Sequence, residues 1–125
     1  NDKYGPQGKH IYYVSSPYIA ARDAYNKIIA EKGYPVGSHG GIQDTSEMMY
    51  LETLPGNKDW VRKDQLPNTL GVMMVDGKRP TGPNVPHNGI SGDARRSSVE
   101  LGKLRHEMKV DYAVKEIQAD IASGK

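Results

Sequence analysis

The pattern of hydrophobic and polar positions predicts helices joined to two short strands. Apolar side chains recur every three to four positions in residues 17–32, 44–54 and 98–122, which is the spacing of one helix face. Residues 10–14 and 70–75 are instead short apolar runs, rich in β-branched and aromatic residues, and these indicate strands. The order strand, helix, helix, strand, helix predicts an α/β fold.

Signals for helix ends support these boundaries. Ser16 before Pro17 fits an N-cap followed by the first helical residue, because proline has no amide hydrogen that needs a partner there. Gly33 stands where a glycine commonly ends a helix. Asp44 and Glu47 have the spacing of a capping box, with Asp44 as the N-cap and Glu47 reaching back to it. The second helix is therefore expected to begin at Asp44.

The apolar faces of the first and last helices predict the core. A second capping box at residues 97–100 opens the last helix. The residues expected to face inward are Tyr18, Ala21, Tyr25, Ile28 and Ile29 in the first helix, and Leu101, Leu104, Met108, Val114, Ile117 and Ile121 in the last.

Composition narrows the possible classes. A chain of 125 residues makes one domain, and a net charge of +2 without charged blocks argues against an extended nucleic-acid surface. No cysteine is present, so disulfides and thiolate chemistry are excluded, and no apolar run is long enough to cross a membrane. The chain begins at Asn1 without methionine, which suggests a processed product or one piece of something larger. We expect a cytoplasmic location, with a periplasmic or secreted one after processing as the alternative.

Residues 38–51, SHGGIQDTSEMMYL, hold the strongest candidate site. His39, Gly40 and Gly41 form a loop that leads into a helix N-terminus, where the positive end of the helix dipole suits an anion or an oxyanion. A histidine titrates near neutral pH and acts as a general acid or base. Spacing alone leaves a hydrolytic role and a hydrogen-bonded loop histidine equally supported.

The other candidates are weaker. His10 and His106 are interpreted as structural, whereas His87 lies in a Pro/Gly-rich loop, residues 79–93, that is long enough to be functional or an interface arm. No pair of histidines has metal-binding spacing, and no nucleophile-elbow serine is present. Asp93, followed by two arginines, fits a charged turn better than a phosphate clamp.

Two segments resemble one known family. HGGIQDTSEMMYL, residues 39–51, resembles the H-[GA]-G-x-x-E-T-S-x-M-x-x-L signature of the creatininase (creatinine amidohydrolase) family. Residues 88–117, including GISGDARRSSVELGK, resemble the family's C-terminal G-x-x-G-D loop and the terminal helix after it. The similarity covers nearly the whole chain, and it implies that residues 1–125 are the C-terminal portion of a single creatininase-like domain.

The resemblance implies a fold, a reaction and a cofactor. The family fold is a three-layer α/β/α sandwich around a mostly parallel sheet, usually in hexamers. Family members hydrolyse cyclic amides and related C–N bonds with one or two divalent metals, expected here to be Zn, Mn or Fe. The metal-ligand patterns, E-x-H and H-x-[EN], do not occur in this sequence. A second chain carrying the N-terminal half is therefore expected to supply these ligands.

Residue roles follow from matching positions. His39 corresponds to the histidine that passes a proton to the leaving nitrogen. Asp44 stands where the signature has glutamate, which leaves lactone-like or sugar-derived substrates as compatible as a cyclic amide. The alternatives are a non-catalytic scaffold subunit and a small-ligand-binding module. The remaining site residues are Ser38, Gly40 and Gly41 for substrate binding and Asp44, Thr45 and Asp93 for support.

Overall fold

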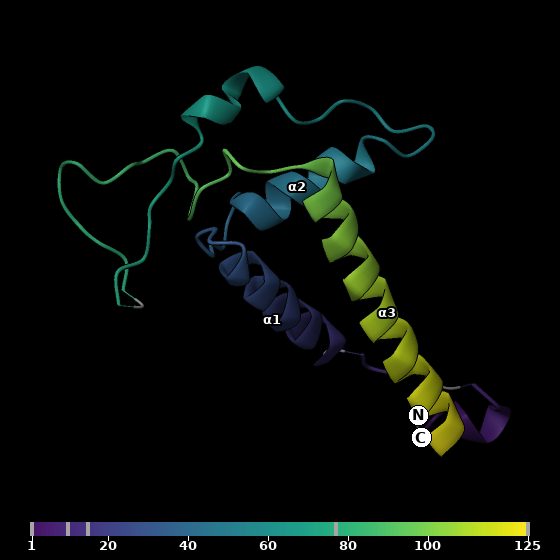
Figure 1. Cartoon of the computed structure of the whole chain (residues 1–125). Helices are drawn as coiled ribbons and strands as arrows, with labels where there is room; N and C mark the ends of the chain where they lie inside the picture. The colour runs from purple at the N-terminus through teal and green to yellow at the C-terminus, as the bar shows by residue number, and fades with distance from the viewer. Residues whose placement is uncertain (1, 10, 15, 77, 125) are drawn as a thin grey trace.

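The computed structural model describes residues 2–9, 11–14, 16–76 and 78–124, which form a helical assembly with long connections (Figure 1). Helix α2 lies across the N-terminal end of α3, and α1 packs against α3 below it. The helical elements of these residues are η1 (Gly5–Gln7), α1 (Ser16–Glu31), α2 (Ile42–Leu51), η2 (Lys63–Asn68) and α3 (Val99–Ser123).

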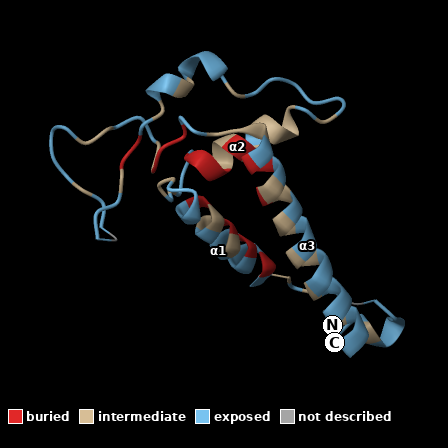
Figure 2. Cartoon of the chain, in the orientation of Figure 1, coloured by how far each residue is buried: buried red, intermediate tan, exposed pale blue. Residues whose placement is uncertain are grey.

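The core lies where the three long helices meet. Tyr25 and Ile29 of α1, Ile42 of α2 and Leu101 of α3 are buried against one another. In Figure 2 buried positions lie on the facing sides of α1, α2 and the first turns of α3, and also on two loop segments beside α2, residues 71–72 and 92–94. Gly102 allows α2 and α3 to approach closely, because a Cβ there would lie only 1.9 Å from the backbone oxygen of a residue in α2. These three helices therefore form the hydrophobic core.

The expected α/β/α sandwich is wrong. Helices make up 50% of the structure and extended pairing only 5%, and the described residues contain no sheet. Residues 11–14 carry no strand, and His10 lies outside the described residues. Residues 70–75 make only isolated bridges, which pair Leu70 with Asp93, Val72 with Ser91 and Val75 with Lys78. An apolar run becomes a sheet strand only where neighbouring strands satisfy its backbone groups, and these runs have no such ladder.

The predicted helices exist, but their predicted N-caps were wrong. Gly41, not Asp44, is the N-cap of α2, and Asp44 lies inside its first turn. Ser98, one position after the start of the predicted capping box, caps α3, and its side-chain oxygen accepts the Leu101 amide at 3.2 Å. Gly33 ends α1 with a φ of 73°, as predicted. Ser16, predicted as the N-cap of the first helix, is instead the first residue of α1, and its side chain donates to Glu116 of α3.

Helix α3 has two apolar faces rather than one. Leu101, Leu104 and Met108 pack at the core, as predicted. The prediction was wrong for Val114, Ile117 and Ile121, which are 44%, 40% and 60% exposed, because they lie on the side of α3 opposite the core residues and face away from α1 and α2. We name the stripe formed by Val110 with these three residues the outer face of α3.

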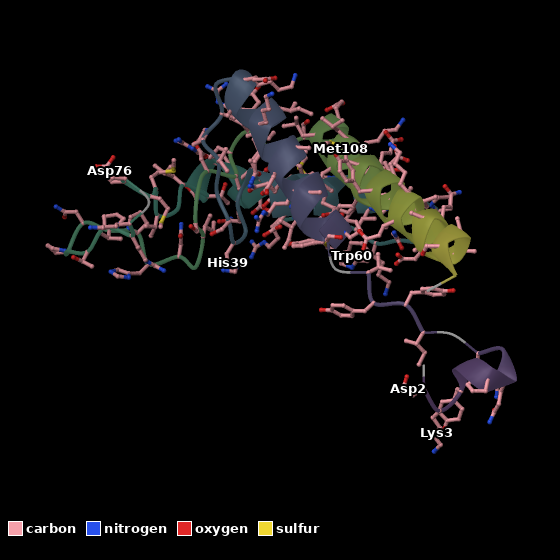
Figure 3. The ribbon with its side chains drawn as sticks, turned by 90° about the horizontal axis from the view of Figure 1, so that it is seen from below. Asp2, Lys3, His39, Trp60, Asp76 and Met108 are labelled. Atoms are coloured by element: carbon pink, nitrogen blue, oxygen red, sulfur yellow. The ribbon has the colours of Figure 1, made fainter. Side chains whose placement is uncertain are left out.

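Residues 52–98 form a loop region beside the helices. Part of it projects away from the helices, and Figure 3 shows Asp76 on this outlying part. Tyr18 also departs from its predicted place in the core, since it is 54% exposed. None of the described helices is both long and apolar enough to cross a lipid bilayer.

Candidate functional site

A small polar cleft lies where α1, the α1–α2 connection and α3 meet. Its volume is about 210 Å³, below the roughly 300–1,000 Å³ of most drug-sized ligand pockets, so it suits a small molecule. Three of the predicted site residues line it, and Figure 3 shows His39 on the connection between α1 and α2. The lining residues are Tyr18, Arg22, Tyr25, Gly37, Ser38, His39, Gln43, Asp44 and Arg105.

The loop that carries His39 is paired with a segment some 50 residues further along the chain. The Ser38 amide donates to the Ser91 carbonyl at 2.9 Å, and the Ser91 amide donates to the His39 carbonyl at 2.8 Å. Gly92, at a φ of 112°, lies so close to Gly37 that a Cβ on Gly92 would be 2.6 Å from the Gly37 Cα. The loop that carries His39 and the segment around Ser91 are thus joined directly.

Asp44 holds this loop from inside α2. Gly40 adopts a left-handed φ of 60°, and its amide donates to Asp44 Oδ2 at 3.0 Å. The other carboxylate oxygen, Oδ1, accepts from Arg105 Nη1 at 2.8 Å. The supporting role predicted for Asp44 therefore has a geometric basis, although Asp44 acts from the first turn and not as the N-cap.

Arg105 is the centre of a charged network between α2 and α3. Its Nε lies 3.3 Å from Glu47 Oε2, while Lys109 Nζ donates to Glu47 Oε1 at 2.7 Å. Arg105 is only 8% exposed, so its charge is held out of water and is balanced by Asp44 and Glu47. Glu47 therefore does not reach back to cap its own helix, as the capping-box pattern predicted.

Two buried polar side chains complete the cleft wall. Gln43 is 5% exposed, and its Nε2 donates to Asn26 Oδ1 at 2.9 Å and to the Gly37 carbonyl at 2.7 Å. Burial raises the pKa of Tyr25 to about 12. Gln43 therefore ties the connection between α1 and α2 to α1 itself.

The remaining predicted residues lie outside the cleft. Gly40 and Thr45 line a second, apolar hollow of about 320 Å³, together with Asp44, which borders both. Thr45 Oγ1 donates to the Gly40 carbonyl at 3.1 Å, so Thr45 also supports the loop. Gly41 is buried as the N-cap of α2.

Asp93 does not border the cleft. Its carboxylate accepts from Arg95 Nε at 2.8 Å and from Arg95 Nη2 at 2.7 Å, a two-point pairing. The hydrogen bond from Arg95 lowers the pKa of Asp93 and outweighs the opposing effect of burial. Asp93 therefore fixes the turn before α3, as expected for a charged turn.

Arg105 was not among the residues singled out from the sequence. It lies on the side of α3 that carries Leu101 and Met108, and a charged residue within an apolar stripe indicates a buried ion pair. The sequence pattern could not identify Asp44 and Glu47 as its partners, because both belong to another helix.

The described residues do not make a metal centre of their own. Within residues 2–9, 11–14, 16–76 and 78–124, no three His, Asp or Glu side chains gather in a way that could hold a metal ion. The nearest carboxylate to the His39 loop, that of Asp44, is already bound to Gly40 and Arg105.

The comparisons with known proteins gave no match to a family model, to a curated protein or to a solved structure. Family membership therefore stays a prediction from the two motif segments.

Proposed function

We propose that this chain contributes an acid–base histidine, His39, to a metal-dependent hydrolase that opens a cyclic amide or a related C–N bond. The observation that supports this most is the pairing of Ser38 and His39 with Ser91, since it joins the two motif segments beside a small polar cleft. A conformationally fixed loop with an exposed imidazole suits proton transfer to a small substrate.

The chemistry assigned to this chain is proton transfer. When a water attacks the amide carbon, one proton leaves that water, and the ring nitrogen needs a proton before it can leave. His39 takes up the first proton and delivers one to the nitrogen, while Ser38 and the Gly40–Gly41 backbone shape the cleft. In this proposal the metal ligands belong to a second chain, and the complex is an oligomer of the hexamer type.

The test combines assembly with activity. The full chain is purified together with any polypeptide that co-purifies with it. The material is then studied by native mass spectrometry and by elemental analysis for Zn, Mn and Fe. Ring opening of a panel of cyclic amides is then measured. A second polypeptide, bound metal and turnover are expected; a metal-free assembly of this chain alone, without turnover, contradicts the proposal.

A matched pair of variants tests whether His39 is the acid–base residue. His39→Ala is expected to lower the rate of ring opening by about 10²–10⁴-fold. His87→Ala changes an exposed histidine of the Pro/Gly-rich loop outside the cleft, and is expected to leave that rate unchanged. Equal rates for both variants would overturn the role of His39.

A small-ligand-binding module is the second candidate. The polar cleft and the absence of a three-ligand metal group among the described residues favour it. Binding of a cyclic amide that persists after chelation, measured by calorimetry and without turnover, would support this candidate over the hydrolase.

A further inference from the structure

One short series of hydrogen bonds joins the His39 loop to the interior of the protein. The Gly40 amide, adjacent to His39, donates to one oxygen of Asp44, and Arg105 donates to the other. We propose that Arg105 is a positioning residue, which holds the His39 loop in place through Asp44.

Asp44 needs such a partner to serve as a fixed acceptor. Its side chain is 45% exposed, so water competes for both of its oxygens. With Arg105 bound to Oδ1, the carboxylate is held in one rotamer, and Oδ2 stays aimed at the Gly40 amide. Without Arg105, Asp44 turns toward water and Gly40 loses its acceptor.

The guanidinium group suits this role for geometric reasons. Its plane is fixed by a second contact, since Nε lies 3.3 Å from Glu47 Oε2 while Nη1 reaches Asp44. Because Asp44 and Glu47 are three positions apart on α2, one planar fork on α3 spans both. A lysine has a single ammonium group and cannot hold both carboxylates in a fixed orientation.

The catalytic consequence of this link rests on the proposed function, whereas the link itself does not. If His39 transfers protons, loosening Gly40 misplaces the imidazole after the substrate has bound. The rate constant then falls, while the KM is little affected.

Amide hydrogen exchange followed by NMR tests the link directly. In Arg105→Met, exchange of the Gly40 amide is expected to accelerate about tenfold. The amide of Gly102, which donates to the carbonyl of the N-cap Ser98, reports on the first turn of α3 and is expected to change little. Arg96→Met is the control, because the Arg96 guanidinium lies over the Tyr34 ring and not on Asp44.

A double variant shows whether Arg105 acts through Asp44. In an Asp44→Asn background, Arg105→Met should no longer alter Gly40 exchange, because the intermediate carboxylate is gone. If circular dichroism shows that Arg105→Met does not fold, Arg105→Lys takes its place. This variant should accelerate amide exchange at Gly40 and leave exchange at Gly102 unchanged.

Two results would overturn the proposal. One is an unchanged rate of Gly40 amide exchange in a folded Arg105 variant. The other is equal acceleration of the Gly40 and Gly102 amides, which is expected if Arg105 only stabilises the packing of the helices. Ring-opening kinetics are a separate readout, with the kcat of Arg105→Met expected to fall about tenfold at similar KM. If the unaltered protein opens no ring, the proposed function fails and the exchange data still decide the role of Arg105.

Discussion

The helical region, α1 to α3, and the loop region, residues 52–98, are held together in different ways. The helices bury large side chains against one another, including Tyr25, Ile29 and Ile42. In the described part of the loop region, the buried hydrophobic residues are only Val72 and Ala94. Backbone hydrogen bonds, closely packed glycines and two buried carboxylates fix this region instead.

This difference affects the candidate site, which lies at the boundary of the two regions. The His39 loop is anchored on one side by Ser91 of the loop region and on the other by Arg105 of the helical region. Loss of apolar packing should therefore unfold the whole protein, whereas loss of polar anchors should open the site locally.

The largest expected effect is in the helical core. Ile42→Ala removes a fully buried side chain and should lower the free energy of unfolding by about 3 kcal/mol. Ile117→Ala, on the outer face of α3, is the matched control and should cost less than about 1 kcal/mol. Urea unfolding followed by circular dichroism measures both, and equal losses would mean that the core is not where the structure places it.

A smaller effect is expected where the two regions meet. Gly92→Ala introduces a Cβ against Gly37 at a positive φ, and should cost about 1–3 kcal/mol. Gly89→Ala is the control, because Gly89 also has a positive φ, 79°, but a Cβ added there would meet no atom within 4 Å. Amide exchange of Ser38 and Ser91 should accelerate more in Gly92→Ala; equal acceleration in the two variants would show that the close approach is unimportant.

The loop region should also respond to acid through Glu52. Burial opposes ionisation of this carboxyl, but the amides of Val61 and Trp60, followed by Lys63, outweigh it and hold its pKa below the ordinary 4.5. A lowered pKa in the folded state means that Glu52 stabilises the loop above pH 4.5, and that this contribution is lost as the pH falls through the lowered value.

Trp60 is the single tryptophan of the chain, so its fluorescence reports on this loop. We expect an emission change with a midpoint below pH 4.5. Glu52→Gln should abolish this transition and weaken the loop by about 1 kcal/mol at neutral pH. An unaltered transition in the variant would assign the acid response to another group.

The smallest effect is expected on the outer face of α3. Val114→Gln and Ile121→Gln replace exposed apolar side chains and should each change the free energy of unfolding by less than about 0.5 kcal/mol. Urea unfolding of each single variant measures this change in the free energy of unfolding. A loss of more than about 1 kcal/mol in either would show that this face is covered in solution.

Local sequence signals located the helices, although not the N-caps of α1, α2 and α3. The apolar spacing and the end signal at Gly33 depend only on residues a few positions apart, so a local pattern can reveal them. Signals that depend on distant partners did not suffice. Residues 70–75 have strand composition, yet a strand needs a neighbour, and the described part of the chain supplies only isolated bridges.

The candidate site was predicted in part for the same reason. The segment containing His39, Gly40 and Gly41 could be singled out, because a histidine beside two glycines before a helix is a local pattern. The capping roles of Asp44 and Glu47 were misassigned, since both carboxylates bind side chains of α3 that a local pattern cannot include.

The sequence by itself determined where helices form and which loop carries the candidate histidine, because propensity, periodicity and backbone freedom are properties of short segments. Only the tertiary structure decided that no sheet forms among the described residues, that the outer face of α3 stays exposed, and that Arg105 reaches Asp44. Each of these depends on which surfaces meet after residues some 60 positions apart come together, and that choice is made by packing and charge pairing over the whole chain.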